Sequence, residues 1–311
     1  MTEAAATLGA VVVHYRRWPH VRQCIDALLA QTRRPDEIVI VDNRSEDGSP
    51  DRIRAAYPEL VVLEASENAG YGAGVNLGVD RLRSSRLEAV LVLTHECVLA
   101  PDALERMEAR LREDERLGAV GPLLGYRSDP NRVFSAGGTL ETRTWRGRHV
   151  DKPTAVRDWD GAEPREVDWL DGACLLVRAA AMSELGPIDD RMFMYFEELD
   201  YFCRMRRAGW RVECVPAAHA WQEPGPKPTY LLTRNRLRFL ARNAPRWQVV
   251  REVLRLVRRI GRRLGTDADG SSRKRLELTA LLHFLVARSG PPPERLRPTG
   301  STPTARLIDL N

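Results

Sequence analysis

Two short segments, far apart in the sequence, carry the residue types that one ligand site would need. Residues 68–76 read NAGYGAGVN, a glycine-rich turn that is expected to begin a helix, and residues 195–200 read YFEELD, with three carboxylates before an arginine-rich helix. Glycines let the backbone approach a bulky anion, and free N–H groups at a helix start bind phosphate. Clustered carboxylates bind a metal ion or act as a general base. Together the segments predict a site where a phosphate-bearing donor is activated beside acidic groups.

Around these segments, the first hundred residues alternate between expected strands and helices. Short apolar runs, typical of buried parallel strands, occupy residues 8–15, 37–41, 61–64 and 89–93. Apolar residues at helical spacing occupy residues 19–31, 49–57 and 74–83. This βαβα order predicts an α/β fold with a doubly wound sheet, in which ligands bind at the carboxyl ends of the strands. Asp42, Asn68 and Glu96 are expected at that edge.

The rest of the chain predicts less regular structure. We expect helices at residues 101–112, 179–185 and 201–208, strands at 118–124, 167–177 and 211–215, and extended loops at 125–164. Residues 229–265 are expected to be helical and strongly basic. The tail after residue 290 is rich in proline, which favours disorder. No internal repeat is present.

Composition excludes several classes of protein. The chain has 311 residues, of which 43% are hydrophobic, enough for one large core or two modest ones. No apolar run approaches the roughly 20 residues that span a bilayer, and no signal-peptide pattern is present. Five scattered cysteines without a CxxC pair indicate reduced thiols and hence a cytoplasmic protein. Only three of the 48 basic residues are lysine, an arginine bias typical of a high-GC genome such as an actinobacterial one.

The order of these motifs resembles that of the family-2 inverting glycosyltransferases of GT-A fold, especially the rhamnosyltransferase-like branch. Each motif alone is weak, but the order is specific, and the likeness covers residues 8–245: VDNRS at 41–45, the glycine-rich turn, the strand 91–93 with its acidic turn, Gly172-Ala173, residues 195–200, and Arg234-Asn235-Arg236 after Tyr230. The resemblance implies a Rossmann-like mixed sheet flanked by helices in a catalytic domain at residues 1–225. A basic helical extension at 226–289 and a disordered tail at 290–311 would follow.

The resemblance further implies that a sugar moves with inversion from a nucleotide diphosphate donor, a dTDP- or UDP-sugar, to an acceptor hydroxyl. A deoxysugar such as rhamnose is favoured, and the acceptor would be a cell-envelope glycan, a lipid-linked glycan or a small natural product. The donor would be bound by residues of the strand edge and the turn: Asp42, Asn43, Asn68, Gly70, Tyr71, Gly74 and Asn76. The acceptor side would include Trp169, Asp171 and Gly172.

Within the acidic segment, Glu198 stands at the family's general-base position, where it would take the proton of the attacking hydroxyl. Glu197 and Asp200 would orient neighbouring groups, or Asp200 would pair with Arg204 one turn along the helix. Simpler interpretations stay open. Asp42 could cap the helix that follows it, the glycine-rich turn could be an ordinary strand-to-helix connection, and the acidic segment could be a helix start stabilised by its dipole.

The chain departs from the family's pattern at the metal site. Members carry Asp-x-Asp after the fourth strand, where this chain has Thr94-His95-Glu96. The metal-binding histidine that often follows the acidic helix corresponds to Gln222, and His219 lies three residues earlier. Glu96 and His219 are therefore the candidate ligands for Mg²⁺ or Mn²⁺, hard cations that prefer oxygen ligands. The alternative is a metal dependence that is weak or absent.

If no metal binds, cationic side chains would have to neutralise the leaving diphosphate. Arg234, Arg236 and His95 are the candidates, because an arginine fork matches phosphate oxygens, and Thr94 would add a hydroxyl on the donor side. A surface role is favoured for the other arginines up to Arg262. Apolar residues along one side of these helices would let them lie on an anionic membrane, so peripheral contact with its inner face is predicted.

Three other functions are compatible with parts of this pattern. An inactive nucleotide-sugar-binding homologue would explain the changed motifs, but a decayed site would not keep carboxylates at positions 96, 198 and 200. A nucleotidyltransferase would need a glycine-rich phosphate loop after the first strand, and residues 14–19 contain no glycine. Nucleic-acid binding is the weakest alternative, because the basic residues concentrate in the C-terminal helices rather than among aromatic residues.

Overall fold

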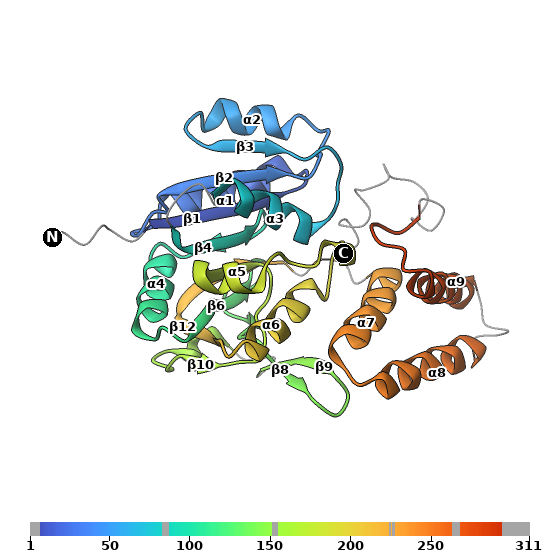
Figure 1. Ribbon diagram of the computed structural model, residues 1–311. Coiled ribbons are helices and arrows are strands. Elements are labelled where there is room, and N and C mark those ends of the chain that lie inside the picture. The colour runs from blue at the N-terminus through green and yellow to red at the C-terminus, as the bar shows by residue number, and fades with distance from the viewer. Residues whose placement is uncertain are drawn as a thin grey trace.

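The computed structural model describes residues 7–82, 87–150, 155–223, 225, 228–262 and 268–293. Its centre is a mixed sheet with the strand order β10-β12-β6-β11-β4-β1-β2-β3, flanked by helices (Figure 1). Side chains alternate along β1 between two apolar cores: Val11 and Val13 lie in one, Ala10 and Val12 in the other. All five cysteines are buried in these cores as free thiols. The predicted α/β fold with a mixed sheet is confirmed.

The N-terminal half forms the parallel part of the sheet. Its elements are β1 (Thr7–His14), α1 (Trp18–Leu29), β2 (Glu37–Asp42), α2 (Ser49–Ala56), β3 (Val61–Glu64), α3 (Tyr71–Leu82) and β4 (Leu87–Thr94). The strand register pairs His14 with Asp42 and Val13 with Thr94, so the carboxyl ends of β1, β2 and β4 lie side by side. Each of these elements was predicted, with ends that differ by a few residues.

The second half extends the sheet with strands of both directions. Its main elements are β5 (Val98–Leu99), α4 (Ala103–Glu113), β6 (Leu117–Tyr126), β10 (Arg165–Glu166), β11 (Cys174–Arg178), α5 (Ala179–Leu185), α6 (Glu197–Arg207) and β12 (Arg211–Gln222). β11 runs antiparallel between β4 and β6, which pairs Cys174 with Leu93. The Thr94 N–H donates to the Ala173 carbonyl at 3.0 Å. The segment before β11 therefore reaches the carboxyl edge of the parallel strands.

Three predictions for this half were wrong in detail. The expected loops at residues 125–164 contain β7 (Val133–Ser135), the hairpin of β8 (Gly138–Glu141) and β9 (Arg146–His149), and a short 3-10 helix, η1 (Val156–Trp159). The strand expected at 167–177 begins only at Cys174, because the preceding residues cross toward the hairpin, where Gly138 and Trp169 form an isolated bridge. The acidic residues lie within the first turn of α6 rather than before it.

In its described residues, the basic C-terminal region forms three helices, α7 (Thr229–Asn243), α8 (Arg246–Arg262) and α9 (Ala268–Leu285). The single helical stretch that the sequence predicts is broken before Pro245. Leu237, Leu256 and Leu281 form a small core between the three helices, which lie together beside the sheet domain (Figure 1). Most of the predicted tail, residues 294–311, lies outside the described residues. Among the helices that the structure describes, none is long and apolar enough to cross a bilayer.

Candidate active site

The glycine-rich turn and the acidic segment meet in space. The Tyr71 N–H donates to the Phe193 carbonyl at 2.8 Å, and the Tyr71 hydroxyl donates to the Gly172 carbonyl at 2.5 Å. Gly70 has a φ of 96°, and a Cβ there would lie 1.9 Å from the Phe193 oxygen, so this contact requires glycine. The Asn43 side-chain amide donates to the Gly70 carbonyl at 3.1 Å. The turn, the end of β2 and the segments before β11 and α6 therefore surround one region.

The other predicted residues of the turn are used within the protein. Asn68 Oδ1 accepts a hydrogen bond from the Gly70 N–H at 3.1 Å and closes the turn. Gly74 lies in α3, where a Cβ would come within 2.8 Å of a β1 side chain. Asn76 forms two hydrogen bonds with the backbone of Ile188, both at 2.9 Å. Asn76 therefore fastens α3 to the segment that leads into α6.

Glu197 and Glu198 begin α6 and differ in exposure. Glu197 is 3% exposed, and its Oε2 has no hydrogen-bond partner among the described residues. Burial raises the pKa of Glu197 to about 7. Glu198 is partly exposed, and burial together with the nearby Glu197 and Asp171 carboxylates raises its pKa well above the usual range. A carboxylate with a raised pKa is a stronger base, which suits proton transfer from a hydroxyl group.

The backbone that leads into α6 is strained. Phe193, Tyr195 and Phe196 have φ values of 67°, 72° and 75°, in the left-handed region that residues other than glycine seldom adopt. The Asn235 side-chain amide donates to the carbonyls of Met194 and Tyr195 at 2.8 and 2.9 Å. Strained segments persist where surrounding bonds fix them, and they cluster at functional sites. Asn235 on α7 therefore determines where the catalytic carboxylates predicted for α6 lie.

Arg234 and Arg236, which the sequence predicts to bind the donor, contact protein carbonyls instead. Arg234 is 0% exposed and donates to the Met192 carbonyl at 2.9 Å and to the Tyr230 hydroxyl at 3.2 Å. Arg236 donates to the Thr144 carbonyl, in the turn of the β8–β9 hairpin, at 2.7 Å. Burial lowers the pKa of both guanidinium groups. Because Arg234 has no exposed surface, it is placed to fasten the strained segment rather than to meet a diphosphate.

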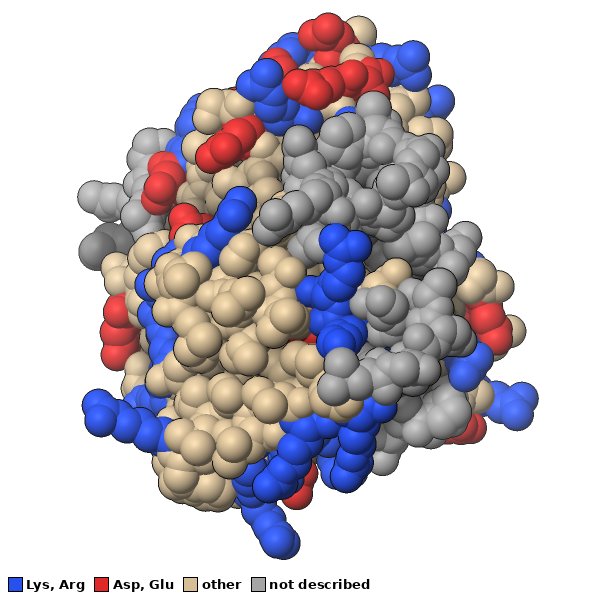
Figure 2. All heavy atoms as spheres, turned by 90° about the vertical axis from the view of Figure 1, so that its right-hand side faces the viewer, with Lys and Arg blue, Asp and Glu red and all other residues tan. Residues whose placement is uncertain are grey.

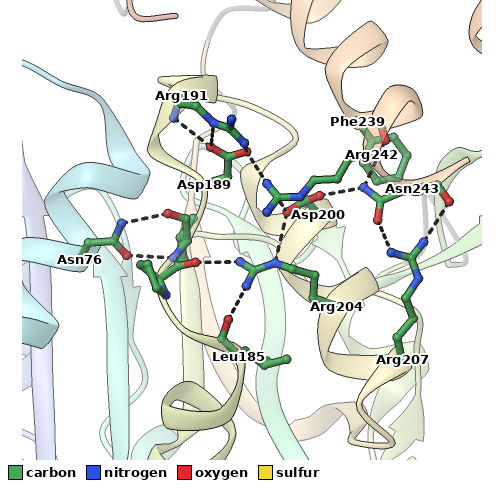
Figure 3. A network of polar contacts seen from close by, with 12 residues as sticks. Asn76, Leu185, Asp189, Arg191, Asp200, Arg204, Arg207, Phe239, Arg242 and Asn243 are labelled. Atoms are coloured by element: carbon green, nitrogen blue, oxygen red, sulfur yellow. Dashed lines mark hydrogen bonds and ion pairs between the residues drawn. The ribbon is translucent and has the colours of Figure 1, made fainter.

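Asp200 lies in a buried polar network between α6 and α7 (Figure 3). It is 0% exposed and accepts hydrogen bonds from Asn243 Nδ2 at 2.7 Å and from Arg204 Nε at 3.3 Å. Arg242 Nη1 lies 3.5 Å from the same carboxylate. The predicted alternative, a pair with Arg204, is confirmed. This carboxylate therefore holds two helices together.

Asp42 ends β2 and is 1% exposed. It accepts hydrogen bonds from the Ser45 N–H at 2.9 Å and from the Ser45 hydroxyl, and burial raises its pKa. The capping alternative is wrong, because the residue that precedes α2 is Gly48 and Asp42 instead closes a turn to Ser45. His14 Nε2 lies 3.7 Å from Asp42, and burial lowers the pKa of His14 to about 2. The neighbouring Asn43 Oδ1 is buried without a hydrogen-bond partner in the described part of the chain.

Glu96, the predicted metal ligand after β4, is paired with an arginine. Arg17 Nη1 lies 3.0 Å from Glu96 Oε1, and Arg127 Nη1 donates to the Glu96 carbonyl at 3.2 Å. Burial raises the pKa of Glu96 and lowers that of His95 to about 3, so His95 is a neutral imidazole. Thr94 Oγ1 and His95 Nε2 are buried, and neither has a hydrogen-bond partner within the described ranges. The turn thus offers neutral polar atoms and one ion-paired carboxylate.

The predicted acceptor-side residues Trp169, Asp171 and Gly172 precede β11. Trp169 is 8% exposed, and its ring lies 4.9 Å from that of His149. Asp171 Oδ2 is buried and lies 3.8 Å from His149 Nδ1. The negative charge of Asp171 is one cause of the raised pKa of Glu198. These two carboxylates therefore belong to one acidic cluster.

Sequence comparison identifies the family. Residues 10–160 match the family model described as Glycosyl transferase family 2. The N-acetylglucosaminyl-diphospho-decaprenol L-rhamnosyltransferase of Mycobacterium tuberculosis is 32% identical over 229 residues, which cover 68% of this chain and 74% of the relative. This chain belongs to glycosyltransferase family 2. The galactofuranosyltransferase GlfT1 of the same organism is 29% identical to this glycosyltransferase over 231 residues, 70% of each chain.

Two solved structures share the fold of this glycosyltransferase. The mannosyltransferase PcManGT from Pyrobaculum calidifontis in complex with GDP-Man and Mn²⁺ superposes with a TM-score of 0.55 at 15% identity, over 91% of this chain and 88% of that chain. GalNAc-T7 with UDP, GalNAc and Mn²⁺ gives a TM-score of 0.58 at 16% identity, over 76% of this chain. This chain spans 48% of the length of that second structure. The likeness confirms the GT-A fold.

The residues around Glu96 do not fit a strong divalent-metal site. No group of three or more His, Cys, Asp or Glu side chains that could hold a metal ion occurs among the residues that the structure describes. Glu96 is already paired with Arg17, while Thr94 and Gln222 offer only neutral oxygens. His219, the second predicted ligand, lies on β12 and belongs to no such group among the described residues.

Sequence reasoning missed two residues that shape this site, Arg17 and Asn235. A signal for Arg17 was available, because it follows the first strand and the carboxyl end of that strand lies at the ligand edge. Asn235 stood inside a recognised motif, but its three backbone partners precede it by about 40 residues and are fixed only by the fold. The sequence motif therefore identified Asn235 but not its hydrogen bonds to the segment before α6.

Proposed function

We propose that this glycosyltransferase moves a deoxysugar, such as rhamnose, from a dTDP- or UDP-sugar to a hydroxyl group of a lipid-linked glycan, with inversion, at the inner face of a membrane. The observation that carries the proposal is the direct contact of the glycine-rich turn with the segment that leads to Glu197 and Glu198. The name of the mycobacterial relative supports the sugar and the lipid-linked acceptor. A small natural product is the second acceptor class.

Glu198 is the general base of the proposed reaction. The acceptor oxygen attacks the anomeric carbon while its proton passes to the Glu198 carboxylate, and the bond to the donor diphosphate breaks on the opposite face of the sugar. Attack opposite to the leaving group inverts the configuration. Burial raises the pKa of Glu198, and Glu197 and Asp171 raise it further, since a nearby negative charge favours the protonated form. Glu197 and Asp171 therefore strengthen the base.

The nucleotide lies at the ends of β1 and β2 in this proposal. Asp42 accepts a hydrogen bond from the ring N–H of uracil or thymine, and Asn43 Oδ1, which has no hydrogen-bond partner among the described residues, accepts one from the nucleotide. Gly70 and Gly74 allow the close contacts with Phe193 and β1 that fix the start of α3, where free backbone N–H groups would meet the diphosphate. Asn68 and Asn76 act indirectly, because their side chains shape and fasten the turn.

Arg17 is the proposed source of positive charge for the leaving diphosphate. Its side chain is 31% exposed and is anchored by Glu96, at the edge where β1 and β4 end. A guanidinium group binds two phosphate oxygens at once. A divalent cation would supply the same neutralisation when bound, and Glu96 with the neutral imidazole of His95, whose Nε2 lies 3.9 Å from Glu96 Oε1, would hold it, but Glu96 is already engaged by Arg17. Weak metal dependence follows from this arrangement.

The proposed function is tested by incubating the purified protein with a panel of nucleotide sugars and a polyprenyl-diphosphate-linked acetamido sugar. We expect transfer from dTDP-rhamnose or a UDP-sugar, and a product whose anomeric configuration, measured by NMR coupling constants, is opposite to that of the donor. Retention of configuration would refute the inverting mechanism. Transfer from GDP-sugars alone would refute the proposed role of Asp42.

A further inference from the structure

One face of α8 is apolar and exposed to solvent. Trp247, Val250, Leu254 and Val257 are 56%, 58%, 50% and 50% exposed. They follow one another at intervals of three, four and three residues, so they form a single stripe along the helix. The side of α8 that faces the protein is occupied by other residues, including Leu256 and Val253. The residues of the stripe are therefore not needed to pack α8 against the rest of the protein.

Arginines border this stripe. α8 contains six arginines and one glutamate, and Arg251, Arg255 and Arg258 each directly follow a residue of the stripe. Glu252 is mostly covered and lies 3.6 Å from Arg255. The Arg251 guanidinium lies 4.9 Å from the centre of the Trp247 ring. The exposed apolar stripe is thus accompanied by a row of positive charge with little negative charge to offset it.

α9 adds a second exposed apolar stripe. Leu278, Leu282, Leu285 and Val286 are 43%, 51%, 66% and 71% exposed and lie on one face at helical spacing. The one described glutamate of this helix, Glu277, is 3% exposed and lies 3.0 Å from Arg259 of α8. α8 and α9 are held together by Leu256 and Leu281. They therefore present their exposed apolar residues from one rigid pair of helices.

The molecular surface shows the same arrangement. On the side where α7, α8 and α9 lie, a broad area without charged residues is bordered by Lys and Arg, and few acidic residues interrupt it (Figure 2). Apart from Leu77, every large hydrophobic residue found exposed in the described chain belongs to α8, to α9 or to the residue that follows α9. The feature is therefore localised to one part of the molecule.

We propose that the α8–α9 surface docks the enzyme onto an anionic lipid bilayer. Amphipathic helices with Trp and Leu on one face and arginine beside it lie in the interface of membranes, with the apolar face among the acyl chains. Arginines beside that face are attracted to anionic headgroups, while Trp is favoured at the interface itself. A second copy of this chain would bring the two rows of arginine toward each other, so charge favours the bilayer as the occupant.

This inference rests on the proposed function in one respect: a lipid-linked acceptor would explain why the enzyme works at a bilayer. It concerns none of the residues of the carboxylate cluster. Vesicles without any glycan lipid therefore test it separately from transfer, and a protein without rhamnosyl transfer activity would still be expected to bind them.

The experiment is flotation of the full chain with vesicles of phosphatidylcholine alone or mixed with phosphatidylglycerol. We expect binding to the anionic vesicles and little to the neutral ones. Binding should weaken steeply as salt is raised toward about 1 M, where the screening length falls to about 3 Å. Arg258→Glu with Arg262→Glu should weaken binding to anionic vesicles by about tenfold or more. Trp247→Gln with Leu254→Gln should weaken it by a similar factor.

Matched controls separate docking from folding. Leu77→Gln removes an exposed leucine of α3, and Arg52→Glu with Arg157→Glu reverses two exposed arginines of the sheet domain. These controls should bind vesicles like the unchanged protein, and all variants should keep its melting temperature. Equal binding to neutral and anionic vesicles would overturn the proposal. Absence of vesicle binding would also overturn it. In that case, analytical ultracentrifugation would test for a dimer. A dimer that Trp247→Gln with Leu254→Gln converts to monomer would identify a second copy of the chain as the occupant.

Discussion

Glu198 at the start of α6 and Glu96 after β4 show how neighbours determine what a carboxylate can do. Burial, together with the neighbouring carboxylates of Glu197 and Asp171, raises the pKa of Glu198 and makes it a better proton acceptor. Glu96 lies among guanidinium groups, with Arg17 at 3.0 Å, and is held as the fixed partner of a cation. Burial raises the pKa of both glutamates, so what distinguishes them is the sign of the charge beside each one.

The largest effect is expected at the base. Glu198→Gln should lower turnover by roughly 10²–10⁴, because the amide cannot take the acceptor proton. Binding of the free nucleotide, measured by calorimetry, should stay the same. Glu163→Gln, at an exposed position, is the matched control. Full activity in Glu198→Gln would assign the general base to Glu197 instead and would contradict the contrast drawn between Glu198 and Glu96.

The second-largest loss of turnover is expected on replacing Arg17, the cation held by Glu96. Arg17→Met should lower turnover by about 10², the loss typical of removing one group that stabilises charge in the transition state. The unchanged enzyme should keep most of its activity in moderate EDTA, as measured by release of the nucleotide diphosphate. Arg22→Met, on the exposed side of α1, serves as control. Complete loss of activity in EDTA, restored by Mg²⁺ or Mn²⁺, would contradict the role given to Arg17.

A smaller effect is expected where the nucleotide base binds. Asp42→Ala should weaken binding of dTDP or UDP by about 1–3 kcal/mol, because the buried ring N–H would lose its acceptor. Calorimetry with the free nucleotides measures this directly, and Asp51→Ala, at a position with 89% of its side chain exposed, is the control. Unchanged affinity would limit Asp42 to its turn with Ser45.

The smallest effect concerns the pH profile and tests the like-charge explanation. A protonated Glu198 accepts no proton, so kcat/KM should fall as the pH drops through the pKa of Glu198. Glu197→Gln removes a neighbouring negative charge that raises this pKa. The acid limb of kcat/KM should therefore shift to lower pH, with a modest loss of rate at high pH because the base is weaker. An unshifted limb would show that Glu197 does not act through its charge.

Much of the sheet edge could be predicted from the sequence. Parallel strands are buried on both faces, so β1 and β2 appear as short apolar runs that end at polar residues. The doubly wound topology then brings the carboxyl ends of β1, β2 and β4 together. Asp42 ends β2 and Glu96 follows β4, which is why both were expected at one edge of the sheet. The glycine-rich turn was identifiable because Gly70 meets a steric requirement that is nearly independent of the rest of the fold.

The remaining features depend on contacts that the sequence does not encode locally. β9 has three exposed residues and a partly exposed His149, so it carries no alternating pattern to mark it as a strand. An arginine that binds carbonyls has the same sequence signature as one that would bind phosphate, and only burial distinguishes Arg234 from Arg17, for which we propose that role. α6 begins after Phe196, whose left-handed φ replaces the usual capping side chain.

Tyr71 constrains how this enzyme could be re-engineered for another sugar. Its N–H and hydroxyl bond the carbonyls of Phe193 and Gly172, and a Cβ at Gly172 would come within 3.3 Å of the Tyr71 ring. A chimaera that takes only the glycine-rich turn from a relative would place the relative's residue at position 71 against an unaltered Gly172 and Phe193. The turn with Tyr71 and the segments around Gly172 and Phe193 would have to be exchanged together, although they are far apart in the sequence.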